Sequence, residues 1–373
     1  MAIEMNTREV ISFFIPSMSD GGAERVTLNL INNLVHRYPY KIDLVLADAS
    51  GPFLDQVDEN VSVIDLEAKN TRSSLFKLSK YIRTRRPIAI VAAMHHANIV
   101  ALLANRICFK HSTKVIATLH INLSVSLKNP TNIRGKYILP AIRLTYRWAH
   151  AIVGVSQGVV DDFMKNVEIE MPNVSRIYNP VITTDLKNKS EQAVNHSWFH
   201  DKSKQVVLAA GRLGKQKNFE LLIDAFKLIE NKTNAYLLIL GEGDSRGLLQ
   251  QKINSYELES RVELAGFVDN PYAYMSHASV FVMSSTFEGL PTVLIEALYC
   301  GATLVSTDCP SGPREILNDG KLGTLVPMED KVALSQGILQ ALQQPRDLPG
   351  ECAWLPYEED TVADQYLKVV LDE

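Results

Sequence analysis

The chain has 373 residues, which is too long for one ordinary hydrophobic core and predicts about two domains. Its 46% hydrophobic content and 8% aromatic content are typical of a soluble α/β protein, and no stretch approaches the ~20 apolar residues of a membrane span. The formal net charge is −4, residues 1–15 do not read as a signal peptide, and the four cysteines lack metal-ligand spacing. We therefore expect reduced thiols and no protein-bound metal.

Short apolar runs alternate with helical patterns along the first half, which is typical of βαβ units and a parallel sheet. A polar stretch with little periodicity, residues 183–204, reads as a linker. The expected strands are 10–15, 42–47, 61–66, 88–93, 114–120, 151–155 and 174–178, and the expected helices are 24–37, 75–85, 98–108, 133–149 and 157–165.

A second series of strands and helices follows the linker. Its strands are 205–210, 235–240, 261–267, 280–284, 303–307 and 323–326, and its helices are 219–230, 246–255, 271–277, 292–300, 313–317, 331–343 and 361–371. The predicted fold class is α/β, with two doubly wound Rossmann-like domains facing across a cleft, where ligands bind outside the strand carboxyl ends. The expected domains are residues 1–182 and 183–358, with a C-terminal helix, 359–373, placed to pack back on the first domain.

The charge is divided unevenly between the two halves. Residues 68–160 contain 15 lysines and arginines and no aspartate or glutamate. An ordinary solvated face remains an alternative, but a window of this length favours an anionic partner such as a membrane surface. Within it, the helix around Arg143 and Arg147 mixes basic and aromatic residues, which fits either a membrane interface or a core-facing stripe with a basic outer face.

The segment from Phe287 to Leu298 carries the strongest functional signal. It follows a buried strand with a loop that holds Glu288, Gly289 and Leu290, and then a helix that contains Glu296. Pro291 suits a first helical position, and the free N–H groups after it would form an anion site. Carboxylates beside an anion site suggest a ligand that has both phosphate and hydroxyl groups, which describes a sugar nucleotide.

A second motif runs from Gly211 to Asn218 after the first strand of the second half. Arg212 and Lys217 place cations at the start of a helix, where they are locally unfavourable unless an anion lies between them. An exposed basic turn is the alternative reading.

Other candidates end strands or begin helices. The paired glycines Gly21 and Gly22 open a long helix and allow close approach of a phosphate or sugar, although a purely structural turn is an equal possibility. His120 ends a strand at the expected mouth of the cleft, although a lone histidine is usually a satisfied polar residue. The strand ends Glu242, Gly266 and Phe267 would line a nucleotide pocket through their backbone groups. Adjacent His95 and His96 are weak candidates, because they cannot both face one ligand.

These residues, taken in order, resemble the GT-B-fold glycosyltransferases of family 4, a retaining, nucleotide-sugar-dependent group, over nearly the whole chain. The segment from Glu288 to Glu296 looks most like bacterial enzymes of surface-glycan assembly. One departure is Asn218, where many members have glycine.

The resemblance implies roles for the candidate residues. Arg212 and Lys217 would hold the donor diphosphate, and Glu288 would bind donor-sugar hydroxyls. His120 would contact the donor sugar near the reacting carbon, and Glu296 would bind the ribose hydroxyls. The remaining contacts would come from the Gly21–Gly22 loop at the diphosphate and acceptor and from the backbone of Gly289, Leu290 and Pro291 at the phosphate.

The expected function is therefore transfer of a sugar from UDP-GalNAc, UDP-GlcNAc or UDP-galactose to a polyprenyl-diphosphate-linked saccharide. The expected place is the inner face of the cytoplasmic membrane, with no metal, no cofactor beyond the donor substrate and no nucleic acid. Two alternatives remain: a sugar-nucleotide 2-epimerase on the same fold, and a non-catalytic module that binds sugar nucleotides or glycans.

Overall fold

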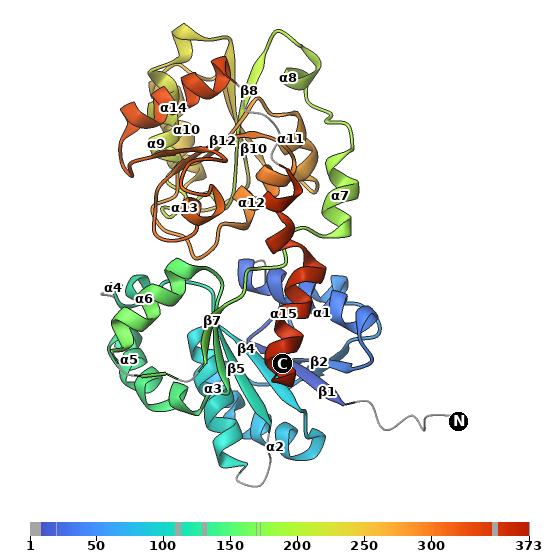
Figure 1. Cartoon of the computed structure of the whole chain (residues 1–373). Coiled ribbons are helices and arrows are strands. Elements are labelled where there is room, and N and C mark those ends of the chain that lie inside the picture. The colour runs from blue at the N-terminus through green and yellow to red at the C-terminus, as the bar shows by residue number, and fades with distance from the viewer. Residues whose placement is uncertain are drawn as a thin grey trace. The chain divides into compact units, whose positions relative to one another are not determined.

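The computed structural model describes residues 9–19, 21–108, 113–128, 133–168, 170–171, 173–344 and 350–372. The described chain forms two compact units, each drawn in Figure 1. The first unit runs to Val181 and resumes at Tyr357, and the second extends from Ile182 to Pro356. The sequence placed these two boundaries after residues 182 and 358.

Among the described residues, the first unit is built on a parallel sheet with strand order β3-β2-β1-β4-β5-β6-β7. Its inner strands are continuous apolar runs because helices cover both faces of a parallel sheet. The strands are β1 (Val10–Ile15), β2 (Lys41–Leu46), β3 (Ser62–Asp65), β4 (Ala89–Ala93), β5 (Lys114–Leu119), β6 (Ala151–Gly154) and β7 (Val174–Arg176). The helices are α1 (Gly22–Arg37), α2 (Leu75–Arg85), α3 (His95–Ile107), α4 (Leu123–Lys128), α5 (Ile133–Thr145), α6 (Gln157–Val167) and α15 (Glu359–Leu371).

Helix α15 completes the core of the first unit although it follows the second unit in sequence. Its buried residues Val362, Tyr366 and Val370 join the apolar cluster around β1 and α1. Ion pairs hold its ends: Arg37 lies 2.8 Å from Asp360, and Lys114 lies 2.6 Å from Asp372. Figure 1 shows this last helix beside α1.

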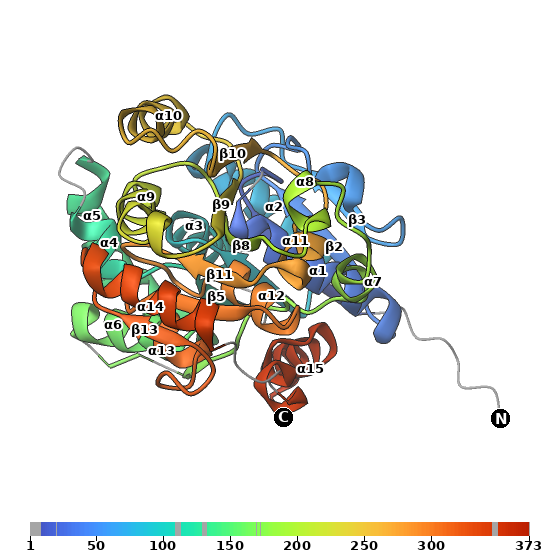
Figure 2. The same cartoon turned by 90° about the horizontal axis from the view of Figure 1, so that it is seen from above.

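Among the described residues, the second unit is built on a parallel sheet with strand order β10-β9-β8-β11-β12-β13. Figure 2 shows α9 and α14 on one side of this sheet and α11 and α12 on the other. The strands are β8 (Gln205–Ala210), β9 (Ala235–Leu240), β10 (Val262–Gly266), β11 (Val280–Met283), β12 (Thr303–Thr307) and β13 (Thr324–Val326). The helices are α7 (Thr184–Ser190), α8 (Ser197–His200), α9 (Phe219–Lys227), α10 (Arg246–Ser255), α11 (Pro271–His277), α12 (Thr292–Tyr299), α13 (Pro313–Ile316) and α14 (Lys331–Gln343).

The prediction of a linker over residues 183–204 was wrong in its local structure. This stretch contains α7 and α8, and α7 packs against α11. The side chain of Thr183 accepts a hydrogen bond from the N–H of Leu186, which caps α7, and Asp185 pairs with Lys189 one turn later. The helix α4 was also missed, and α1 and α3 begin at Gly22 and His95, earlier than expected.

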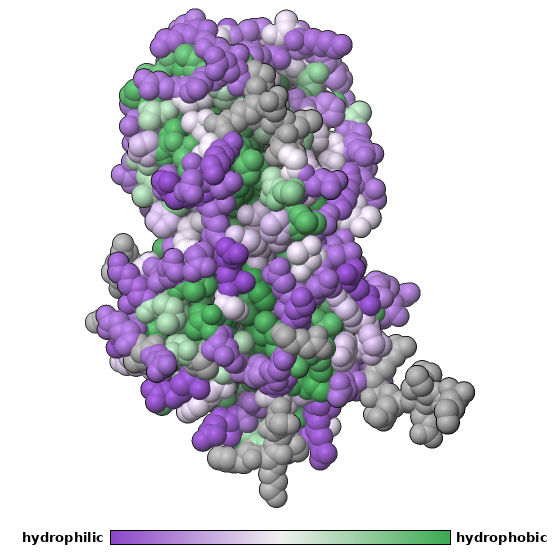
Figure 3. Space-filling model, in the orientation of Figure 1, coloured by the Kyte–Doolittle hydropathy of each residue, from purple (hydrophilic) through white to green (hydrophobic). Residues whose placement is uncertain are grey.

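No helix in the part of the chain that the structure describes has the length and apolarity required to cross a membrane. On the face drawn in Figure 3, hydrophilic residues cover most of the surface and apolar residues show in smaller areas between them.

Candidate active site

Glu288 is the centre of a dense polar cluster in the loop that follows β11. Its side chain is only 9% exposed, and its Oε1 accepts hydrogen bonds from Lys217 Nζ at 2.8 Å and from Ser285 Oγ at 2.7 Å. Its Oε2 accepts a third bond from Gln216 Nε2 at 3.2 Å. A buried carboxylate needs such partners to remain charged, because the protein interior solvates a charge poorly.

The backbone of Glu288 is fixed as firmly as its side chain. The N–H of Glu288 donates to Pro310 O at 2.7 Å, and its carbonyl accepts from the N–H of Ser311 at 2.9 Å. The loop after β12 is thus hydrogen-bonded to both the N–H and the carbonyl group of Glu288, in the loop after β11. The backbone places this side chain before any ligand binds, and such preorganisation is what a binding site requires.

The loop from Gly211 to Asn218 brings Lys217 to Glu288. The side chain of Lys217 passes over Gly211, where an added Cβ would lie 3.0 Å from Lys217 Cε. Asn218 then adopts a left-handed conformation with φ of 47° directly before α9. Glycine and asparagine tolerate this conformation best, so asparagine is a physically reasonable replacement for the glycine that many family members carry. Arg212 lies exposed in the same loop.

Two loops of the second unit are pressed together through their glycines. An added Cβ on Gly241 would lie 2.1 Å from Gly211 O, and one on Gly243 would lie 2.5 Å from Leu213 O. Both glycines also have positive φ, 130° and 154°. Glycine is therefore required at positions 241 and 243, because a side chain there would clash with the backbone of the loop after β8. Its expected role in lining a nucleotide pocket stays a prediction.

Helix α12 begins at Thr292, and Pro291 is its N-cap residue in an extended conformation. The prediction that Pro291 occupies the first helical position was therefore wrong by one residue. No side chain caps this helix, so its first N–H groups point toward the loop that holds Gly289 and Leu290. Glu296 lies in the middle of the helix and is partly exposed.

The strand-end residues of β9 and β10 have a different environment. Glu242 Oε1 accepts a hydrogen bond from Arg246 at 2.8 Å, and an added Cβ on Gly266 would lie 2.9 Å from the same oxygen. Phe267 is 76% exposed. The structure thus gives Glu242 a surface ion pair with a residue that the sequence did not single out.

In the first unit, Gly21 is the N-cap residue of α1, and an added Cβ on Gly22 would meet nothing within 4 Å. The preceding loop is held by Gly51, whose added Cβ would lie 2.1 Å from Met18 O and whose φ is 115°. The open space at Gly22 is compatible with close approach of a ligand.

His120 follows β5 directly, and its Nε2 lies 2.9 Å from Thr118 Oγ1. Burial lowers the pKa of His120 to about 4, so the ring is neutral near pH 7.

The adjacent residues His95 and His96, at the start of α3, differ in burial. His95 is buried, with Nδ1 3.0 Å from the hydroxyl of Tyr146, whereas His96 is exposed. Burial, and secondarily the neighbouring His96 and His120, lower the pKa of His95 to about 4. His95 is therefore a neutral core residue, and the two rings face different surroundings.

Sequence reasoning missed several residues that hold the candidate site. Gln216 and Ser285 support Glu288, and Thr118 supports His120. Thr118 precedes His120 by two residues at the end of a strand, and residues two apart share a face, so this partner could have been found. The pairing of Gln216 with Glu288 depends on the two loops meeting in space. In the described parts of the chain, no group of three or more His, Cys, Asp or Glu residues could hold a metal ion.

Two family models match the chain. Residues 20–185 match the model described as Glycosyltransferase Family 4, and residues 190–353 match Glycosyl transferases group 1. A relative from Campylobacter jejuni, N-acetylgalactosamine-N,N'-diacetylbacillosaminyl-diphospho-undecaprenol 4-alpha-N-acetylgalactosaminyltransferase, is 31% identical over 89% of this chain and 90% of its own length. The amylovoran biosynthesis glycosyltransferase AmsD of Erwinia amylovora is 27% identical over 81% of each chain.

A solved structure of Anabaena Alr3699/HepE in complex with UDP superposes with a TM-score of 0.79 over 98% of this chain and all of that one, at 20% identity. Two parallel α/β units of this topology, with these matches, define a glycosyltransferase of the GT-B fold. The chain belongs to glycosyltransferase family 4.

Proposed function

We propose that this chain is a retaining, metal-independent hexosyltransferase of bacterial glycan assembly. It takes the sugar from UDP-GalNAc, UDP-GlcNAc or UDP-galactose and adds it to a polyprenyl-diphosphate-linked saccharide. The relatives support this choice, because the Campylobacter relative is an N-acetylgalactosaminyltransferase that acts on a diphospho-undecaprenol saccharide. The Anabaena structure was solved with UDP.

The single observation that carries the proposal is the buried pair of Lys217 and Glu288. An ammonium group has three donors, and Glu288 uses one of them, so two remain for the oxygens of a donor diphosphate. A carboxylate has about four acceptor positions, and the three bonds to Glu288 leave about one, on Oε2, for a sugar hydroxyl. The pair can therefore bind a phosphate and a hydroxyl group side by side.

The same groups suit the chemical step. Breaking the anomeric bond places negative charge on the leaving diphosphate and positive charge on the sugar ring. Lys217, Arg212 and the first N–H groups of α12 would stabilise the diphosphate, and each such preorganised donor is worth roughly 2.7–4 kcal/mol in kcat. The departing phosphate would take the proton of the acceptor hydroxyl on the same face of the sugar, which gives retention. Glu296 would bind the ribose hydroxyls.

The test is an assay of nucleotide release with the three UDP-sugars, each with and without a short polyprenyl-diphosphate saccharide, followed by NMR of the product's anomeric proton. Acceptor-dependent release with a retained α-linkage is expected, and EDTA should leave the rate unchanged. An isomerised sugar nucleotide formed without acceptor would identify an epimerase instead. Donor binding without turnover would identify a binding module, and activity lost in EDTA and restored by Mn²⁺ would refute metal independence.

We further propose that the first unit attaches peripherally to the inner face of the cytoplasmic membrane through α2. Phe76 is 75% exposed, and Lys80 and Arg83 follow it on the same helical face, four and seven residues later. An apolar side chain beside cations suits an anionic bilayer, where each basic residue contributes about 1 kcal/mol. Within the acid-free window 68–160, Lys110, Lys128, Arg134 and Lys136 lie outside the residues whose side chains are described.

The helix around Arg143 and Arg147 has a core-facing stripe that includes the fully buried Ile142 and Tyr146, while Tyr137 and Leu144 are exposed. Arg143 donates to the carbonyl of Val167 at 2.8 Å, so this cation already has a partner within the chain. We therefore assign the membrane contact to α2 first.

Vesicle co-sedimentation tests the membrane contact. The double variant Lys80→Glu/Arg83→Glu should lose binding to vesicles that contain phosphatidylglycerol, and binding of the unmodified chain should weaken with salt. The charge-matched control Lys232→Glu/Lys331→Glu, which changes exposed lysines of the second unit, should bind normally. Equal binding of the unmodified chain to neutral vesicles would overturn the assignment.

A further inference from the structure

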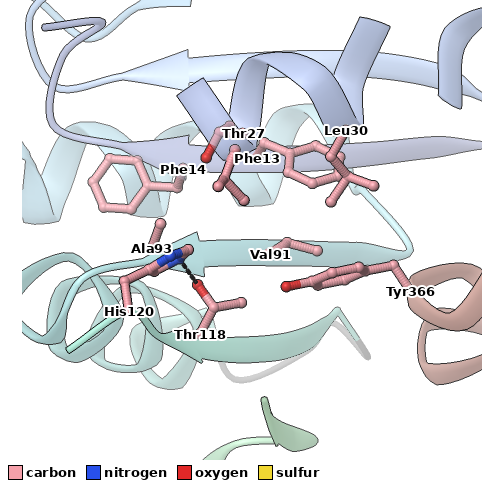
Figure 4. A pocket seen from close by; sticks show the side chains of 10 residues that line it. Phe13, Phe14, Thr27, Leu30, Val91, Ala93, Thr118, His120 and Tyr366 are labelled. Atoms are coloured by element: carbon pink, nitrogen blue, oxygen red, sulfur yellow. Dashed lines mark hydrogen bonds between the residues drawn. The ribbon is translucent and has the colours of Figure 1, made fainter. Parts of the chain in front are cut away.

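The hydrogen bond between His120 and Thr118 determines more than the position of the ring. The two residues lie on β5 and directly after it, two positions apart, so their side chains share a face. Figure 4 shows the ring of His120 turned toward Thr118, and the distance from Thr118 Oγ1 to His120 Nε2 is 2.9 Å. A bond of this length needs one donor and one acceptor.

The single proton of the Thr118 hydroxyl is already committed elsewhere. Thr118 Oγ1 donates to Ala92 O on β4 at 2.8 Å, and a carbonyl oxygen can only accept. A threonine hydroxyl has one proton, so toward His120 it acts as an acceptor. Nε2 of His120 must therefore carry a proton and donate it to Thr118.

The surroundings of His120 favour the neutral ring. The small cavity behind it has a volume of about 10 Å³, close to the least space that holds one water molecule. The residues that line the cavity come from β1, α1, β4, β5 and α15, and none of them has a carboxylate or a permanently charged side chain. The lining residues are Phe13, Phe14, Val26, Thr27, Leu30, Val91, Ala93, Thr118, His120 and Tyr366. Among the described residues, His95 also interacts electrostatically with His120, and its ring is neutral. A neutral imidazole has one proton, so Nδ1 of His120 is left as an acceptor.

We propose that Thr118 is a positioning residue that fixes His120 as the Nε2-protonated tautomer, so that Nδ1 accepts a hydrogen bond from a hydroxyl group of the transferred sugar. This inference rests on the proposed glycosyltransferase function for its ligand. It assigns His120 the role of a hydrogen-bond acceptor. His120 is accordingly neither a proton donor to the leaving group nor a cationic contact to the diphosphate.

The direct test is NMR of the full chain labelled with ¹⁵N at histidine, which reports the tautomer of each ring. The spectrum of His120→Gln identifies the His120 signals by their absence. The unmodified chain should show His120 protonated on Nε2, and Thr118→Val, which keeps the shape but removes the hydroxyl, should add an Nδ1-protonated population. Thr118→Ser should restore the original tautomer.

Tyr366 supplies a matched control. Its hydroxyl faces the same cavity from α15 in Figure 4, and no hydrogen bond links it to His120 among the described residues. Tyr366→Phe should leave the His120 tautomer unchanged. An Nδ1-protonated ring in the unmodified chain, or an unchanged tautomer in Thr118→Val, would overturn the inference without any activity measurement.

Kinetics with UDP-GalNAc and a polyprenyl-diphosphate saccharide then test the consequence. Thr118→Val should lower kcat/KM for the donor about three- to tenfold, the loss expected for one neutral hydrogen bond, and Thr118→Ser should remain within about twofold. A Thr118→Val enzyme with altered tautomer and unchanged kinetics would show that no sugar hydroxyl uses Nδ1. Absence of any transfer by the unmodified chain would refute the proposed function and leave the tautomer result standing.

Discussion

The two units use polar residues in different ways. In the second unit, Glu288 accepts hydrogen bonds from the ammonium group of Lys217, the amide of Gln216 and the hydroxyl of Ser285. These donors lie in the loops that follow β8 and β11. In the first unit, His120 and His95 are neutral, and their partners Thr118 and Tyr146 are uncharged. The cluster around Glu288 therefore contains an ion pair, whereas the pairs that hold His95 and His120 consist of neutral hydrogen-bonding groups.

The largest expected effect tests the charged side of this comparison. Lys217→Ala removes the ammonium group from Glu288 and from the proposed diphosphate site, so kcat/KM for the donor should fall by about 10²–10³. The exposed neighbour Lys215→Ala serves as the control and should stay near the unmodified rate. Near-normal activity of Lys217→Ala would remove the basis for the donor site in the second unit.

The first unit also contains the buried carboxylate of Asp43, and loss of its ion-pair partner should be costly. Asp43 is fully buried on β2 and accepts hydrogen bonds from Arg85 Nε at 2.8 Å and from Tyr81 at 2.6 Å. Arg85→Ala leaves the carboxylate with Tyr81 alone among these partners, and we expect a loss of up to about 3 kcal/mol in unfolding free energy.

Urea unfolding followed by intrinsic fluorescence measures this loss. The exposed Arg83→Ala, two residues away on the same helix, should change the unfolding free energy by less than about 0.5 kcal/mol. If Arg85→Ala is as stable as Arg83→Ala, the buried carboxylate does not depend on its ion pair.

Acid should affect the first unit through its neutral histidines. The folded pKa of His95 and of His120 is about 4, below the ordinary value of 6.5, so the unfolded chain binds more protons between these two values. The unfolding free energy should therefore fall as the pH drops from 6.5 toward 4, by at most roughly 1.4 kcal/mol per pH unit for each histidine.

Urea midpoints at pH 7 and pH 5.5 measure this dependence. His95→Gln should flatten it, whereas the control His277→Gln changes an exposed histidine of the second unit and should not. A profile that stays equally steep in His95→Gln would show that His95 is not a source of the acid sensitivity.

The smallest effect concerns the backbone of the loop from Gly211 to Asn218. Asn218 has a left-handed conformation, which costs most side chains roughly 1–2 kcal/mol. Asn218→Ala should lower the unfolding free energy by about 1 kcal/mol, whereas Asn218→Gly should change it little. Equal effects of the two substitutions would contradict the assigned conformation.

Most of the architecture could be predicted from the sequence because its signals are local. The strands β1, β8, β9 and β12 match their expected ranges, since buried parallel strands are short apolar runs between helical patterns. The helices α7 and α8 were missed because capping and packing on α11, rather than an apolar stripe, support such short helices.

The candidate site could be predicted only in part. Glu288 and Lys217 were each identified from their local motifs, but the ion pair between them joins residues 71 positions apart. The sequence assigned Lys217 to the phosphate and Glu288 to the hydroxyl groups, as two separate contacts. In the structure the two side chains are in direct contact.

The fold class, the family and the residue types of the proposed donor site could be predicted from the sequence, because they depend on local periodicity and on motifs a few residues long. The partners of Glu288, the tautomer of His120 and the packing of α15 on the first unit could be found only in the folded chain. The physical reason is that hydrogen-bond direction, burial and pKa depend on neighbours that are distant in the chain, and folding brings these neighbours together.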